Sequence, residues 1–329
     1  MEYKADAGRY DNMIYRYCGQ SGLLLPVISL GLWHNFGSES DFGEAEKIVH
    51  TAFDNGITHF DIADNYGTPP GSAEETFGRI LKNGLSCYRD EIIVTTKAGH
   101  DMWDGPYGSW GSRKHIIAGL NQSLKRMCVD YVDIFYSHRP DPETPLEETM
   151  YTLADIVRSG KALYIGISKY DKEQTIAAAK ILQSEHIPFI CYQGKYSMLS
   201  RNIEKDILPQ AAIEGLGFIA YSPLAQGLLT QRYFDGIPED SRVARQGFLK
   251  AAEVTTEVVS KAKKLSEIAS LRGQTLAQMA LAWVLKDTRV TSVICGASSV
   301  TQLKSNLNTL DNIDFTSEEL LRIEEILRK

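Results

Sequence analysis

Short apolar runs alternate along this chain with longer segments in which apolar residues recur every three or four positions. The short runs are rich in β-branched residues and are typical of strands buried on both faces of a parallel sheet. Eight such runs occur, at residues 27–33, 57–62, 91–97, 131–137, 162–168, 189–193, 217–222 and 290–295. A Gly-Gln-Ser-Gly turn between two further runs predicts a small β-hairpin over residues 14–26.

The longer segments have the period of amphipathic helices. They cover residues 44–55, 73–83, 113–127, 145–159, 171–184, 203–214, 255–272, 276–285, 299–310 and 318–329. Strands that alternate with helices predict the α/β fold class with a parallel sheet. Eight repeated units predict a (β/α)8 TIM barrel with an N-terminal β-hairpin and extra C-terminal helices. A doubly wound open sheet is the alternative.

The chain is expected to form one domain over residues 1–329, because no linker rich in Pro, Gly or Ser divides it. Its length of 329 residues is sufficient for one large barrel. The longest irregular stretch, residues 223–249, follows the seventh strand. So long a loop in a compact domain is more often functional than idle.

The composition excludes several classes of protein. A net charge of −7 argues against a nucleic-acid partner, since phosphate binding needs a concentrated basic face. No stretch approaches the roughly 18 apolar residues of a membrane helix, and no apolar signal core begins the chain, so no membrane association is expected. The five cysteines form no CxxC pair, which favours reduced thiols in the cytoplasm. Without an HExxH motif, a His cluster or a Gly-x-Ser-x-Gly elbow, neither a metal site nor a serine nucleophile is expected.

Four acid–base side chains follow three successive predicted strands. Asp61 ends the second strand, and Tyr66 comes five residues later. Lys97 ends the third strand, and His138 follows the fourth. Because the carboxyl ends of barrel strands form the active-site face, these side chains are expected to meet there. A lysine at the end of an apolar strand is costly to bury unless it is paired, so Lys97 is difficult to explain as a structural residue.

Together the four side chains suit proton donation to a carbonyl oxygen. A positive charge on Lys97 would lower the pKa of Tyr66, and Asp61 would keep that lysine charged and oriented. His138 would direct a carbonyl group by hydrogen bonding. Taken alone, His138 is explained equally well as a structural histidine, and Tyr66 is better explained as an ordinary loop aromatic. The four together favour an active site.

Two glycine-containing segments are candidates for dinucleotide binding. Residues 215–220, Gly-Leu-Gly-Phe-Ile-Ala, fit the motif G-x-G-x-x-A, but they end a predicted helix and open a strand, the reverse of a Rossmann fingerprint. They are interpreted as a helix C-cap and turn. Residues 295–299, Cys-Gly-Ala-Ser-Ser, open the helix that carries Gln302 and Asn306, so backbone N–H groups there could bind a phosphate. A plain helix cap explains this second segment equally well.

From about residue 14 to its end, the chain resembles the aldo-keto reductase superfamily. The acid–base residues match the catalytic tetrad of that family in order and strand position: Asp61, Tyr66, Lys97 and His138. Within the family, the chain is most similar to the branch of potassium-channel β subunits and bacterial L-glyceraldehyde 3-phosphate reductases. This likeness is carried by residues 137–149, 222–230, 236–242 and 293–298. Channel subunits carry Asn where His138 stands, so the reductases are the better match.

The resemblance implies NADPH-dependent reduction of small aldehydes or ketones, such as L-glyceraldehyde 3-phosphate or methylglyoxal. Tyr66 would be the general acid, tuned by Lys97 and Asp61, and His138 would orient the carbonyl. The residues implied to bind NADPH or NADP+ are Trp33, Asp61, Ser168, Lys169, Gln193, Tyr221, Ser222, Pro223, Leu224, Ala225, Gln226, Arg232, Arg242, Gly296, Ser298, Gln302 and Asn306. Lys169 and Ser305 depart from the residues that many members carry at these two positions.

The same resemblance gives these residues roles. Ser168 and Gln193 would bind the nicotinamide carboxamide, and Tyr221 would stack on the ring. The loop over residues 222–232 would line the pyrophosphate, and Arg242 would lie near the 2′-phosphate.

On the substrate side, the candidates are Trp33, Trp103 and Arg139, in or beside barrel-top loops. A phosphorylated or dicarbonyl substrate is expected if Arg139 or Arg201 faces the pocket. The alternative function is a cofactor-bound regulatory subunit with little turnover, as in channel β subunits, and a third is a barrel hydrolase or lyase without nicotinamide. Oligomers are common in this branch, so a homo-oligomer is an open alternative to a monomer.

Overall fold

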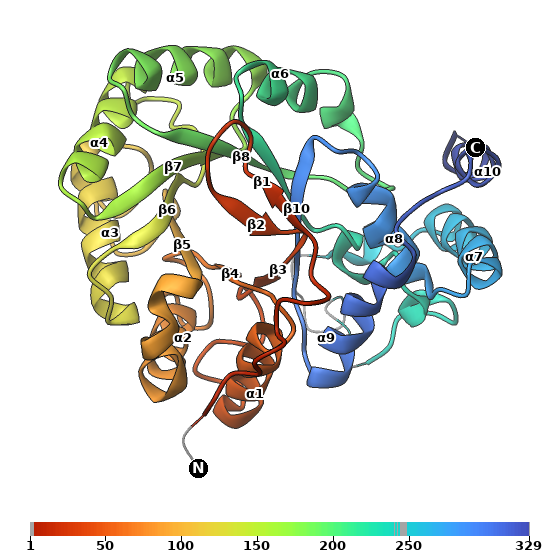
Figure 1. Cartoon of the computed structure of the whole chain (residues 1–329). Coiled ribbons are helices and arrows are strands. Elements are labelled where there is room, and N and C mark those ends of the chain that lie inside the picture. The colour runs from red at the N-terminus through yellow and green to blue at the C-terminus, as the bar shows by residue number, and fades with distance from the viewer. Residues whose placement is uncertain (1–2, 240, 242, 244–248, 329) are drawn as a thin grey trace.

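The computed structural model describes residues 3–239, 241, 243 and 249–328. Eight parallel strands form a closed barrel in the order β10-β3-β4-β5-β6-β7-β8-β9. Their bounds are β3 (Ile28–Gly31), β4 (His59–Asp61), β5 (Ile93–Ala98), β6 (Val132–Ser137), β7 (Ala162–Ser168), β8 (Phe189–Lys195), β9 (Gly217–Tyr221) and β10 (Val290–Cys295). The closed ring confirms the predicted (β/α)8 barrel and excludes the open sheet (Figure 1).

An antiparallel hairpin precedes the barrel, as the turn at residues 19–22 predicts. It consists of β1 (Tyr15–Tyr17) and β2 (Leu24–Pro26), and it lies across the centre of the ring of strands in Figure 1. Leu25 is fully buried against residues of the barrel interior, and the Cys18 thiol donates to the Ile190 carbonyl. Arg16 binds the carbonyl oxygens of Val290 and Leu285 at 2.7 and 2.9 Å. The hairpin therefore covers the amino-terminal end of the barrel.

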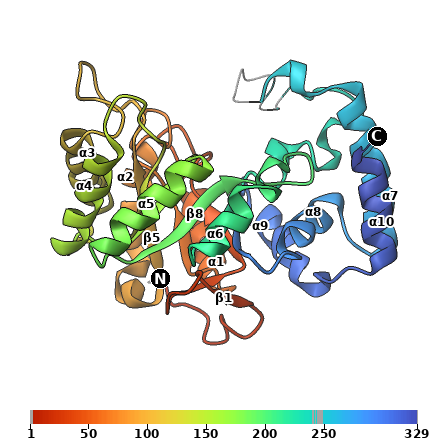
Figure 2. The ribbon, with the colours of Figure 1, turned by 90° about the horizontal axis from the view of Figure 1, so that it is seen from above.

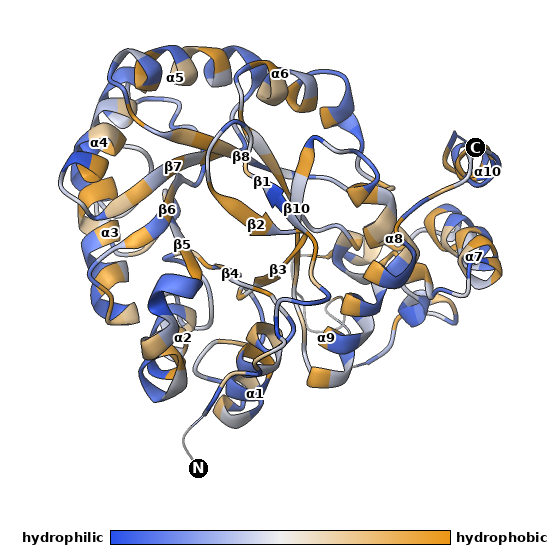
Figure 3. Ribbon diagram, in the orientation of Figure 1, coloured by the Kyte–Doolittle hydropathy of each residue, from blue (hydrophilic) through white to orange (hydrophobic). Residues whose placement is uncertain are grey.

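Helices cover the outside of the ring. They are α1 (Phe42–Phe53), α2 (Ser72–Ile80), α3 (Arg113–Met127), α4 (Leu146–Arg158), α5 (Lys172–Ser184), α6 (Ile207–Ile213), α7 (Thr256–Leu271), α8 (Leu276–Leu285), α9 (Val300–Leu307) and α10 (Ser317–Arg328). In Figures 1 and 2, α7 and α10 lie side by side at the outer edge of the molecule. Figure 3 shows that the helices carry both hydrophobic and hydrophilic residues, as expected for elements with one face on the barrel.

Most helices begin where the sequence offers a capping side chain. Ser112 and Thr255 accept hydrogen bonds from backbone N–H groups of the first turns of α3 and α7. Asp171 with Gln174 forms a capping box at α5.

Three predicted helix bounds are wrong by three residues or more. The helix predicted over residues 299–310 ends at Leu307, where a short 3₁₀ helix, Asn308–Asn312, begins. The helix predicted over residues 203–214 begins at Ile207, because Pro209 has no N–H and can occupy only the first turn. The helix predicted over residues 73–83 ends at Ile80, and the chain continues as a short π-helix, Leu81–Leu85, that contains Gly84. None of these three differences moves the end of a strand.

Within the described residues, no helix combines the length and the apolar content that crossing a bilayer requires.

Candidate active site

The parallel register brings the ends of β4, β5 and β6 to one level of the barrel. Asp61 is paired with Thr95, and Lys97 with Tyr136. The Lys97 side chain is completely buried, and its Nζ donates to Asp61 Oδ2 at 2.7 Å and to the Ile62 carbonyl at 2.7 Å. Burial lowers the pKa of Lys97, and the charge of Asp61 opposes that shift. The buried ammonium is thus held by one carboxylate and one backbone oxygen.

Asp61 is oriented from its other oxygen. Oδ1 accepts from Gln193 Nε2 at 2.8 Å and from Thr95 Oγ1 at 3.2 Å. A carboxylate that accepts several bonds in a buried site is held rigidly, because each bond removes rotational freedom. Gln193 comes from β8 on the opposite side of the ring, so this bond crosses the barrel top.

Tyr66 lies in the loop after β4, with its ring centroid 4.9 Å from Lys97 Nζ. Burial raises the pKa of Tyr66 well above its ordinary value, and the charge of Asp61 raises it further. The expectation of a lowered pKa is therefore wrong for this arrangement, because desolvation and the negative charge of Asp61 raise the pKa of Tyr66. The phenol is protonated at neutral pH, which is the form that can donate a proton.

His138 stands edge-on to Tyr66, with ring centroids 5.9 Å apart. Burial lowers the pKa of His138 well below its ordinary value, and Lys97 and His100 lower it further. The imidazole is therefore neutral near pH 7. Its Nδ1 is buried without a hydrogen-bond partner in the described part of the chain. A neutral imidazole can still donate one hydrogen bond, as carbonyl orientation requires.

A cavity of about 510 Å³ opens above these side chains at the carboxyl ends of the strands. Its size lies in the range of small-molecule sites. The predicted site residues that line it are Trp33, Asp61, Tyr66, His138, Ser168, Lys169, Gln193, Tyr221, Ser222, Gln226 and Gly296. The other lining residues are Gly31, His34, Asn35, Asn65, His100, Lys195, Glu253 and Ile294.

The loop after β9 has an unusual backbone where it borders this cavity. Ser222, Ala225 and Gln226 adopt positive φ angles of 54°, 47° and 58°. Non-glycine residues in this region are strained by on the order of 1–3 kcal/mol each, and such strain concentrates at functional sites. Gln226 Oε1 is buried and has no hydrogen-bond partner among the described residues. Pro223, Leu224 and Ala225 belong to the same loop but are outside the described cavity lining.

The segment after β10 leads into α9 beside the cavity. Ser299 caps that helix by accepting from the Gln302 N–H. Ser298 donates to Gln302 Oε1 from its N–H at 2.8 Å and from its hydroxyl at 2.9 Å. Asn306 is buried, and its Nδ2 has no partner in the described chain. The residues that cap α9, Ser299 and Gln302, therefore belong to the segment considered as a phosphate site.

The remaining predicted site residues lie elsewhere. Arg232 is exposed in the turn Gln231–Tyr233 and is not among the described residues that line the cavity. Arg242 falls outside the described residues. Trp103 packs its ring on His115, with centroids 4.9 Å apart, and is also outside the described lining.

Neither arginine considered for substrate binding lines the cavity in the described chain. Arg139 donates to the Gly99 carbonyl at 2.8 Å and to Ser109 Oγ at 2.9 Å, and its guanidinium lies 3.6 Å from the Trp110 ring centroid. Arg201 forms ion pairs with Glu204 and Glu324. Both arginines therefore have structural partners away from the acid–base site.

Sequence reasoning missed His100, which lines the cavity two residues after the end of β5. Its ring lies edge-on to His138 at a centroid distance of 4.5 Å, and its Nε2 lies 3.2 Å from Lys169 Nζ. The position of His100 just past a strand end is the same signal that identified His138.

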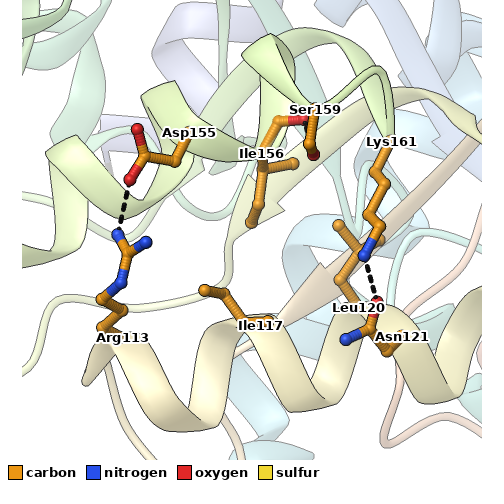
Figure 4. A pocket seen from close by; sticks show the side chains of 8 residues that line it. All are labelled: Arg113, Ile117, Leu120, Asn121, Asp155, Ile156, Ser159 and Lys161. Atoms are coloured by element: carbon orange, nitrogen blue, oxygen red, sulfur yellow. Dashed lines mark hydrogen bonds and ion pairs between the residues drawn. The ribbon is translucent and has the colours of Figure 1, made fainter.

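A second hollow, of about 270 Å³, lies on the outer side of the barrel between α3 and α4 (Figure 4). Arg113 pairs with Asp155 at 2.7 Å, and Lys161 donates to Asn121 at 2.7 Å across it. Arg113 is neutralised by Asp155, Lys161 has only an amide partner, and no group in this hollow has the buried acid–base environment of Lys97. The chemistry belongs to the cavity at the barrel top.

The barrel-top residues fit a dinucleotide. The buried Gln226 Oε1 and Asn306 Nδ2 lack partners in the described chain, and buried polar atoms normally have them, so a polar ligand would satisfy both. Among the described residues, no three His, Cys, Asp or Glu side chains gather in a way that could hold a metal ion.

A model of the Aldo/keto reductase family matches residues 27–328. A protein named L-glyceraldehyde 3-phosphate reductase, from Escherichia coli O157:H7, is 53% identical over 331 residues, which cover 99% of this chain and 95% of that protein. A probable voltage-gated potassium channel subunit beta from Arabidopsis thaliana is 36% identical over 324 residues, covering 96% of this chain and 97% of its own length. A putative subunit of the same kind from Schizosaccharomyces pombe is 38% identical over 329 residues, covering 96% and 94%.

Proposed function

This chain belongs to the aldo/keto reductase family and is an oxidoreductase, and we propose that it reduces small aldehydes and ketones to alcohols with NADPH as the hydride donor. The observation that carries the proposal is the buried Asp61–Lys97 pair beside Tyr66, at the floor of a cavity of about 510 Å³. Members of the family generally use NAD(P)H. The candidate substrates are L-glyceraldehyde 3-phosphate and methylglyoxal, the first supported by 53% identity to a reductase of that name.

Tyr66 would donate the proton. Its raised pKa keeps the hydroxyl protonated until negative charge develops on the carbonyl oxygen. As the proton leaves, the fixed positive charge of Lys97, 4.9 Å from the ring, stabilises the phenolate that forms. Asp61 keeps that ammonium in place, so little reorganisation is needed during the reaction.

His138 would fix the carbonyl oxygen beside Tyr66. Because the imidazole is neutral near pH 7, it binds the oxygen as a hydrogen-bond donor and leaves the proton transfer to the phenol. Bound nicotinamide would supply the hydride to the carbonyl carbon.

The residues proposed to hold the dinucleotide come from three barrel-top segments. Ser168 and Gln193, both buried at the cavity wall, would bind the carboxamide, and Tyr221 would stack on the ring. The strained loop at Ser222 would bind the pyrophosphate. The start of α9, with Ser298, Gln302 and Asn306, would bind the adenosine end.

A cofactor-bound regulatory subunit is the second candidate, because relatives named as channel subunits are 36–38% identical. It predicts tight cofactor binding with negligible turnover. The neutral His138 beside Tyr66 supports turnover instead.

A panel of carbonyl substrates assayed with NADPH and with NADH tests the proposal. We expect consumption of NADPH with methylglyoxal or glyceraldehyde 3-phosphate. Tight NADPH binding without turnover on any carbonyl would favour the regulatory subunit, and absence of NADPH binding would contradict both functions.

A further inference from the structure

Three successive strands place nitrogen-bearing side chains around one side of the cavity mouth. His100 follows β5, His138 follows β6, and Lys169 follows β7. The rings of His100 and His138 meet edge to face at 4.5 Å, and Lys169 Nζ lies 3.2 Å from His100 Nε2. The proposed carbonyl site is therefore continuous with an exposed ammonium group through one intervening imidazole.

The backbone at Lys169 is held in an uncommon conformation. Its φ is +66°, in the left-handed region that a lysine rarely adopts. Non-glycine residues there persist when surrounding structure demands it, and they cluster at ligand sites. The adjacent Ser168 is buried in the strand, whereas Lys169 is exposed at the cavity mouth.

The ammonium of Lys169 faces a neutral partner instead of a carboxylate. Burial lowers the pKa of His100 to about 4, and Lys169 and Arg139 lower it further, so this imidazole is uncharged near pH 7. Its Nε2 can then accept one of the three N–H donors of Lys169, which leaves two for a ligand.

The electrostatic surroundings of Lys169 also favour an anion. Partial desolvation at the cavity mouth lowers the pKa of Lys169 to about 8 although the side chain reaches solvent, and the positive charges of Lys97 and Arg139 contribute to the shift. The nearby Asp101 is bonded to Ser109 and lies 3.5 Å from Arg139. An anionic group beside Lys169 would offset the repulsion among these cations.

We propose that Lys169, supported by His100, binds the anionic group of the substrate, a phosphate or carboxylate, while the carbonyl lies at Tyr66 and His138. This inference rests on the proposed reductase function and assigns its substrate class. Because only the His100 ring separates Lys169 from His138, the anionic group should lie a few carbons from the carbonyl. A three-carbon phosphorylated aldehyde meets that requirement.

The test compares glyceraldehyde 3-phosphate with glyceraldehyde, which lacks the phosphate, and uses the ratio of their kcat/KM values. We expect Lys169→Met to lower this ratio at least about tenfold, the effect of losing one charge-assisted hydrogen bond. Lys169→Arg should retain most of the ratio because it keeps the charge. Lys172→Met, which removes an exposed lysine at the start of α5, is the matched control and should leave the ratio unchanged.

His100→Phe keeps an aromatic ring against His138 but removes the Nε2 acceptor. We expect it to lower the same ratio by about threefold, since it affects the position of Lys169 and not its charge. NADPH binding, titrated by protein fluorescence, is measured for every variant.

The outcomes separate the anion site from the reductase function. Equal losses on both aldehydes in Lys169→Met, with weakened NADPH binding, would place the lysine on the cofactor phosphates and overturn the anion site alone. If the unmodified protein reduced neither aldehyde, the reductase function itself would fail, and the anion site with it.

Discussion

Lys97 and Asp61 form an ion pair of 2.7 Å in which the side chains are 0% and 3% exposed. Charges so deeply buried are tolerated only with good geometry and further hydrogen bonds. The Ile62 carbonyl supplies the further bond to Lys97, and Gln193 supplies one to Asp61. The pair is therefore a unit that binds two sides of the barrel top together.

Removal of one member of this pair should be costly. We expect Asp61→Ala to lower the free energy of unfolding by about 3–5 kcal/mol, because an unpaired ammonium remains buried. The double variant with Lys97→Met should lose less than the sum of the two single variants, because neither charge is then left alone. Urea denaturation of the four proteins measures the coupling, and simple additivity would show that the two charges stabilise the fold independently.

Tyr66→Phe should abolish most turnover while leaving the cofactor site intact. A positioned proton donor contributes roughly 10²–10⁴-fold, so kcat should fall by that factor on every carbonyl. NADPH binding should be unchanged. The exposed Tyr107, altered to Phe, serves as the control. Undiminished turnover in the Tyr66 variant would exclude it as the acid.

Tyr221→Ala should weaken NADPH binding. Loss of the stacked ring should weaken the free energy of NADPH binding by about 1 kcal/mol. The dissociation constant for NADPH should therefore rise about fivefold to tenfold. Tyr221→Phe keeps the ring and should bind normally. Fluorescence titration gives the constants without reliance on turnover, and equal binding by both variants would exclude the stacking role.

Acid should destabilise the protein through His59. This imidazole is fully buried beside Ser29, and burial lowers its pKa from 6.5 to about 4. The unfolded chain therefore binds a proton that the folded one does not, so stability falls as pH drops from 6.5 toward 4. His59→Gln should remove this pH dependence, which lowers the free energy of unfolding by about 2 kcal/mol between pH 7 and pH 5. Denaturation at both pH values compares the variant with the original chain, and parallel losses would contradict the assignment.

Arg272 should contribute measurably to the attachment of α10. Its side chain is 2% exposed and binds Glu319 at 2.7 Å and the Asp314 carbonyl at 2.8 Å. Arg272→Ala should cost about 1.5–3 kcal/mol, since several hydrogen bonds of a buried, charged side chain are lost at once. Arg328→Ala is the matched control, because Arg328 is 82% exposed beside Glu324. It should lower the free energy of unfolding by less than about 0.5 kcal/mol. Thermal unfolding of the two variants distinguishes them.

The fold could be predicted because each barrel strand is a short apolar run, which differs from the longer amphipathic segments that form the helices. The acid–base residues could be found because Asp61, Lys97 and His138 interrupt such runs at equivalent positions. Their environment could not be predicted, since the direction of the Tyr66 pKa shift is set by the burial of the phenol and its position relative to Asp61.

Contacts between segments far apart in the chain could not be predicted from the sequence pattern either. Lys169 and His100 are 69 residues apart, and only the order of strands β5, β6 and β7 brings them together. For the same reason, residue type alone suggested Arg139 and Arg201 as substrate cations. The structure gives both of them partners in loops and helices instead.

The hairpin of β1 and β2 has a kinetic consequence. Because it covers the amino-terminal end of the barrel, molecules reach the acid–base residues from the opposite end, where Lys169 and Ser222 stand at the rim. Under the proposed function, cofactor and substrate would share this entrance. A molecule held beneath the other would enter first and leave last, and its slow departure would then limit the turnover rate.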